Sequence, residues 1–142
     1  MRKCMRYSMM LIAAVFLFST SPVPAQDISL ARPILLLKEA VDGMPKGDRQ
    51  EIKVLTAIIK PGGKTVFHTH RFPVTVYILE GAFTLEMDGR PTVTVKVGEA
   101  MVEPPNVKMT GYNKSTTQPM RVVIFYVSDL NSPFLDPVKA VN

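Results

Sequence analysis

The sequence predicts an all-β protein, a single domain folded as an antiparallel β-barrel or jelly roll. Three observations support this class. Apolar residues recur at a two-residue period in short runs, the pattern of strands with one buried face. Gly, Pro, Asn and Asp interrupt these runs at close spacing, as turns between antiparallel strands require. Beyond the N-terminal segment, no helical period extends over a useful length.

The N-terminal segment has the layout of a secretory signal peptide. Arg2, Lys3 and Arg6 make a basic start, and residues 9–18 form an apolar run too short to span a bilayer as a helix. The small residues that end in Ala25 predict cleavage after that position. We therefore expect a periplasmic or secreted protein with no stable membrane insertion after cleavage.

Composition argues against a nucleic-acid partner and against a disulfide in the mature domain. The formal net charge is +5, but three of the positive charges belong to the signal peptide, so the mature chain carries +2. These charges are scattered without a basic block, which argues against a nucleic-acid partner. The only cysteine, Cys4, lies in the signal peptide, so the mature domain has no disulfide and depends on packing.

The chain divides into four parts: a signal peptide at 1–25, an N-terminal extension at 26–50, the barrel at 51–127 and a C-terminal tail at 128–142. Within the extension, the run from Ile34 to Ala40 fits either a strand or one helical turn. The tail is rich in Pro and Asn, and we expect it to pack on the outside of the barrel.

About eight strands are expected in the barrel. Turn signals separate them, such as Pro61-Gly62-Gly63 and the hairpin pair Asp88-Gly89. The run VTVYIL is almost fully apolar and β-branched, which predicts a central, buried strand. The expected strands are 51–60, 64–70, 74–79, 82–87, 92–97, 100–103, 107–112 and 120–127.

Two histidines, His68 and His70, stand just before this buried strand. Residues i and i+2 of a strand share a face and lie about 6.6 Å apart at their Cα atoms. Two imidazoles at this spacing can converge on one metal ion. They do not complete a site, because zinc sites use three or four protein ligands and non-haem iron sites add a carboxylate.

Two segments resemble the motifs of the cupin family. Residues 62–81 (GGKTVFHTHRFPVTVYILEG) resemble the first motif, which is Gly, five residues, His-x-His, three or four residues, Glu, six residues and Gly. Residues 98–113 (GEAMVEPPNVKMTGYN) resemble the second, which is Gly, five residues, Pro-x-Gly, two residues, His, three residues and Asn. The resemblance covers most of the mature chain and implies a small barrel around a metal site.

The departures from these motifs imply a degenerate metal site. In metal-binding cupins the two histidines and the glutamate of the first motif, with the histidine of the second, hold one ion. Here the glutamate position falls on Val74 and the second histidine position on Met109. Asn106 replaces the usual glycine of the second motif, and asparagine tolerates a left-handed turn conformation. The resemblance carries over only His68 and His70 as ligands.

Met109 makes copper the favoured ion over iron, manganese, nickel or zinc. A thioether is a soft ligand, and with two imidazoles it suits Cu(I). Glu103 is the alternative third ligand and would restore a site for a harder divalent ion. We expect an apolar pocket wall made of Val74, Val76 and Ile78.

Three functions remain open at this stage, and the sequence alone leaves undecided whether the protein is an enzyme. The first is a binding protein that holds a metal ion or a small molecule in the barrel through His68 and His70. The second is a metal-dependent dioxygenase or isomerase of the cupin kind, acting on a small organic substrate. The third is a metal-free structural or partner-binding barrel. The resemblance also implies a homodimer.

Overall fold

The computed structural model describes residues 31–139. The chain divides into two units, Met1–Pro33 and Ile34–Asn142, and the fold described below belongs to the second. The signal peptide and its cleavage site after Ala25 lie outside the described residues, so export stays a prediction. The described part contains only strands, turns and irregular segments, and no helix there is long and apolar enough to cross a membrane.

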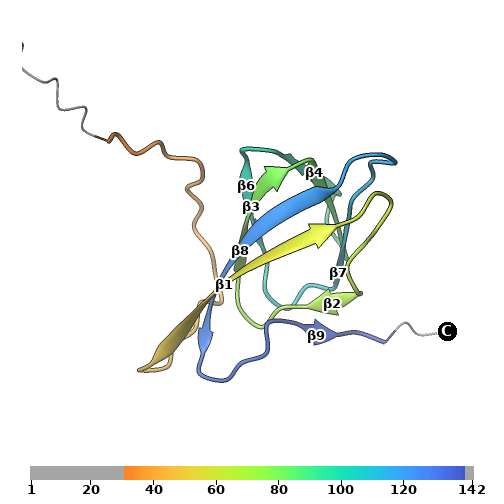
Figure 1. Ribbon diagram of the computed structural model, residues 1–142. Coiled ribbons are helices and arrows are strands. Elements are labelled where there is room, and N and C mark those ends of the chain that lie inside the picture. The colour runs from red at the N-terminus through yellow and green to blue at the C-terminus, as the bar shows by residue number, and fades with distance from the viewer. Residues whose placement is uncertain (1–30, 140–142) are drawn as a thin grey trace, which may run out of the picture. The chain divides into compact units, whose positions relative to one another are not determined.

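Two antiparallel sheets make up the fold, as the sequence predicts (Figure 1). The four-stranded sheet has the order β1 (Gln50–Ile59), β8 (Met120–Asp129), β3 (Val74–Glu80) and β6 (Ala100–Glu103). The five-stranded sheet has the order β5 (Val93–Lys96), β4 (Ala82–Met87), β7 (Met109–Tyr112), β2 (His68–Thr69) and β9 (Asp136–Pro137).

The core lies between the inward faces of these sheets. Every second residue of β8 is buried, and the first half of β3 alternates in the same way, because successive side chains of a strand point to opposite faces. Burial at this period is what the apolar runs predict. The buried hydrophobic residues are Val74, Val76, Ile78, Phe83, Leu85, Val95, Met109, Met120, Val122, Ile124 and Tyr126.

The strand expected at 64–70 is much shorter than the sequence suggests. Only His68–Thr69 forms a strand, and Lys64 makes an isolated bridge to Tyr112. The hydroxyl of Thr65 accepts a hydrogen bond from the amide of Gly111 at 2.9 Å. A side-chain oxygen thus takes the place of a backbone partner, and this local substitution interrupts the ladder.

The run from Ile34 to Ala40 forms neither a strand nor a helical turn. No described strand pairs with it, and a strand forms only where a neighbouring strand exchanges backbone hydrogen bonds with it. Ile34, Leu35 and Leu36 remain exposed.

The turn between β6 and β7, within the second motif, has the expected conformation. Asn106 has φ of 60°, in the left-handed region that asparagine tolerates better than most residues. Its amide donates a hydrogen bond to the carbonyl oxygen of His70 at 2.7 Å. This bond ties the turn after β6 directly to the end of the histidine segment, and so holds the two candidate halves of the site together.

Candidate metal centre

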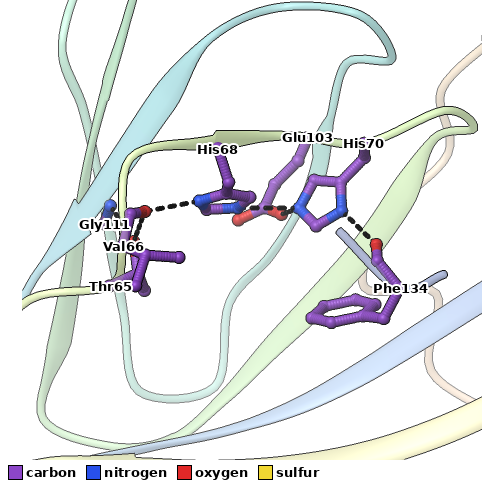
Figure 2. A network of polar contacts seen from close by, with 7 residues as sticks. All are labelled: Thr65, Val66, His68, His70, Glu103, Gly111 and Phe134. Atoms are coloured by element: carbon purple, nitrogen blue, oxygen red, sulfur yellow. Dashed lines mark hydrogen bonds and ion pairs between the residues drawn. The ribbon is translucent and has the colours of Figure 1, made fainter. Parts of the chain in front are cut away.

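Three buried side chains meet inside the barrel: His68, His70 and Glu103 (Figure 2). The Nε2 atoms of the two histidines are 3.0 Å apart, and Nε2 of His70 lies 3.1 Å from Oε2 of Glu103. The three residues expose only 4%, 1% and 5% of their surface, respectively. The two histidines lie close together, as their spacing in the sequence predicts, and Glu103 is the third member of the cluster.

The two sheets contribute different parts of this cluster. His68 begins β2 of the five-stranded sheet, and Glu103 ends β6 of the four-stranded sheet. Glu103 stands directly opposite Val74 in the pairing of β3 with β6, and opposite residues of an antiparallel pair share a face. The carboxylate that the motif lacks at Val74 is therefore present one strand away, on the same face of the sheet.

Each histidine is held by a backbone carbonyl at its other ring nitrogen. Nδ1 of His68 lies 2.7 Å from the carbonyl oxygen of Val66, and Nδ1 of His70 lies 2.7 Å from that of Phe134. A carbonyl oxygen can only accept, so each Nδ1 carries the proton that it donates. Burial lowers the pKa of His68 below its usual value, which favours the neutral ring. A neutral ring with a protonated Nδ1 has a lone pair at Nε2.

The Nε2 atoms of both histidines and a carboxylate oxygen of Glu103 therefore converge in a buried space. At these distances a cation or a proton must lie between them. A metal ion fits this space. Two nitrogens at 2.0–2.1 Å from one ion are about 2.8–3.4 Å apart at the angles of octahedral and tetrahedral shells, and 3.0 Å lies in that range. The carbonyls at Nδ1 are the outer partners that metal-binding histidines usually have.

Met109 lies beside this cluster. It begins β7 and pairs with His68 across the ladder, so its side chain points to the same face, and it is 1% exposed. Its role as a ligand stays a prediction. Of the expected pocket wall, Val76 lines the cavity described below, while Val74 and Ile78 are fully buried in the core.

A small cavity of about 120 Å³ opens beside the cluster. The two histidines and Glu103 line one part of it, and most of the remaining wall is apolar. Its apolar side chains are Ala57, Ile59, Val76, Phe83, Val122, Ile124, Phe134 and Leu135.

The C-terminal segment corrects one expectation. The tail was expected to pack on the outside, yet Phe134 and Leu135 line the cavity and the carbonyl of Phe134 orients His70. The ring of Phe134 packs 4.9 Å from that of His70 and 5.6 Å from that of Tyr126, measured between centroids. Burial of these aromatic rings outweighs the polar composition of the segment. We call residues 130–139 the C-terminal strap.

The strap is attached at several points. The amide of Val138 donates to the carbonyl of Phe67, and β9 pairs with β2. Arg71 forms two hydrogen bonds with Asp136, at 2.8 and 3.0 Å, and this guanidinium lowers the pKa of the Asp136 carboxyl. The sequence did not predict that Phe134, Leu135 and Asp136 would lie at the site. The one available signal was the pair Phe134-Leu135, which is apolar within an otherwise polar tail.

Comparison with known proteins places the chain in a family. Residues 55–126 match the model described as the cupin domain, and the chain belongs to that family. A comparison with curated proteins gives no match.

Several solved structures share the fold at low sequence identity. A cupin-like protein from Thermotoga maritima is 22% identical, with a TM-score of 0.52 over 64% of this chain and 67% of its own. A double-stranded β-helix domain protein from Klebsiella pneumoniae is 15% identical, with a TM-score of 0.54 over 78% of this chain and 100% of its own. The DMSP lyase DddQ from Ruegeria pomeroyi is 18% identical, with a TM-score of 0.51, and the match covers 58% of this chain and only 41% of the lyase.

Proposed function

We propose that the protein binds a divalent metal ion through His68, His70 and Glu103, and that this ion acts on a small organic molecule in the adjacent cavity. The observation that carries the proposal is the convergence of two histidine Nε2 atoms and a carboxylate at a buried point. Two histidines and one carboxylate suit non-haem iron and related divalent ions, and three protein ligands leave coordination positions open.

The residues have separate tasks in this proposal. The two histidines donate nitrogen lone pairs, Glu103 supplies the negative charge that balances a divalent ion, and the apolar wall excludes water. When bound, such an ion supplies Lewis-acid polarisation of an oxygen on the molecule in the cavity. The reaction class that we propose is the one the family resemblance implies, a dioxygenase or an isomerase.

Copper binding is the second candidate, and one observation favours it. Met109 is fully buried and opposite His68 in register, so a soft site of two imidazoles and a thioether is the competing ligand set. The presence of Glu103 in the cluster weighs against it, because a carboxylate is a hard ligand that prefers divalent ions to Cu(I).

Elemental analysis of the exported protein, purified without chelators or affinity metal, tests both candidates. We expect near-stoichiometric iron, manganese, nickel or zinc. Glu103→Gln should lower the affinity for that ion strongly, and the similarly sized Met109→Leu should leave it nearly unchanged. Copper that is retained by Glu103→Gln and lost by Met109→Leu would support the second candidate instead. A protein without metal that also fails to reconstitute would leave a metal-free structural barrel.

We also propose that the protein works outside the cytoplasm as a homodimer. β1 lies at the edge of its sheet and exposes Ile52, Val54 and Ile58 on its outer face, next to the exposed Phe125 of β8. A second copy is the occupant that we propose, since a ten-residue edge strand with free backbone groups can pair with its own symmetry mate. Val54→Lys should convert the dimer to a monomer in light scattering, and a wild-type monomer would exclude this proposal.

Mass analysis of the exported chain tests cleavage after Ala25.

A further inference from the structure

The cavity beside the metal cluster differs in its two parts. One part carries the three candidate ligands, and the remaining wall has no charged residue among those described. Thr65 is the only other polar residue in the wall. Its hydroxyl already donates to the carbonyl of Val66 at 3.1 Å and accepts from the amide of Gly111 at 2.9 Å.

The side chains of the wall away from the cluster therefore offer no unused hydrogen-bonding group. A ligand with a second polar group in this part of the cavity would lose its bonds to water and gain none from the protein. Buried polar groups without partners weaken binding by roughly 10- to 100-fold. Sugars, diacids and phosphorylated compounds would all suffer this loss.

The size of the cavity limits the ligand further. The cavity measures about 120 Å³. An apolar protein cavity of about 150 Å³ stays dry and binds benzene, so this one has room for a body of about five or six non-hydrogen atoms.

From these observations we propose the substrate class: a small molecule with one oxygen-bearing head that reaches the metal cluster and a short, branched or cyclic apolar body without further polar groups. The inference rests on the proposed function, because the head is taken to bind the ion held by His68, His70 and Glu103. The apolar body is recognised by the wall, and the wall exists whether or not an ion is bound.

The first test uses two probes that differ by one hydroxyl. Calorimetric titration of the zinc-loaded protein compares 3-methylbutanoate with 3-hydroxy-3-methylbutanoate, and octanoate serves as the length control. We expect the hydroxylated probe to bind roughly 10- to 100-fold more weakly and octanoate to bind weakly or not at all. Equal or tighter binding of the hydroxylated probe would overturn the inference.

A cavity-filling variant locates the binding. Ala57 lines the cavity from β1, opposite Val122. Ala57→Leu should retain full zinc content and lose at least tenfold in affinity for 3-methylbutanoate. Unchanged affinity in a variant that keeps its zinc would place the probe elsewhere and overturn the inference.

The metal-free protein separates this inference from the proposed function. Benzene has no head group, and we expect it to shift the nuclear magnetic resonances of cavity residues in wild-type protein without metal but not in Ala57→Leu. Benzene binding together with failure to bind any metal would refute the proposed function while supporting an apolar cavity. Metal binding with no benzene binding would leave the proposed function intact and overturn the apolar-ligand inference.

Discussion

The two histidines of the candidate metal cluster have the same side chain but are held in different ways. Nδ1 of His68 donates to the carbonyl of Val66, two residues earlier in the same segment. Nδ1 of His70 donates to the carbonyl of Phe134, 64 residues later, in the C-terminal strap (Figure 2). One ring is oriented by local chain geometry and the other by a tertiary contact. Loss of the strap would therefore free the ring of His70 while the ring of His68 keeps its hydrogen bond to Val66.

The strap lies beyond the part of the chain that defines the family. The cupin match ends at residue 126, before the strap begins. The barrel strands that carry His68 and Glu103 belong to the matched segment, whereas the group that orients His70 does not. The candidate site is therefore held in part by a segment outside the matched domain, and removal of that segment tests the difference directly.

Deletion of residues 133–142 should have the largest effect. It removes the carbonyl that holds His70, and loss of an outer partner of a metal-binding histidine typically lowers metal affinity about 10- to 100-fold. Phe134→Ala is the matched control, because it removes the ring but keeps the carbonyl, and we expect a smaller loss. Competition with a chelator measures both affinities. Unchanged affinity after the deletion would show that the strap does not orient His70.

Thr65→Val should have an intermediate effect, and on stability rather than on metal binding. The variant keeps the shape of the side chain but leaves the amide of Gly111 without its acceptor. An unsatisfied backbone donor of this kind costs about 1–3 kcal/mol in the free energy of unfolding, measurable with urea. Metal affinity should fall less than threefold, because Nδ1 of His68 keeps its bond to Val66. A tenfold loss of metal with normal stability would mean that Thr65 itself positions His68.

Asp136→Asn should have the smallest effect, since Asp136 and Arg71 are about half exposed and solvent screens their pair. Arg71 lowers the pKa of Asp136, so the pair stabilises the fold above the ordinary carboxyl pKa and loses this contribution as the pH falls through the lowered value. Acid unfolding curves should therefore differ between wild type and variant near neutral pH and converge in acid. If the two proteins still differ in stability at a pH below the pKa of Asp136, the effect of the substitution does not come from the charge of this carboxylate.

The turns and most of the strands were predictable because the residue patterns that indicate them lie within short segments. The two-residue period of β3 and β8 and the left-handed tolerance of Asn106 need only neighbouring residues. The failures are equally physical. The shortened β2 depends on the hydroxyl of Thr65 meeting Gly111, and the position of the strap depends on aromatic contacts between Phe134 and the barrel. Neither contact leaves a periodic trace in the sequence.

The sequence by itself determined the all-β barrel and the placement of His68 and His70 close together, because strand period, turn residues and spacing along one strand are properties of short segments. Tertiary structure alone decided how the cluster is completed. Glu103 joins the two histidines because β3 and β6 pair in one particular register, and His70 is oriented because the strap reaches the cavity. Both depend on residues distant in the chain, whose approach is set by sheet pairing and core packing rather than by any local pattern.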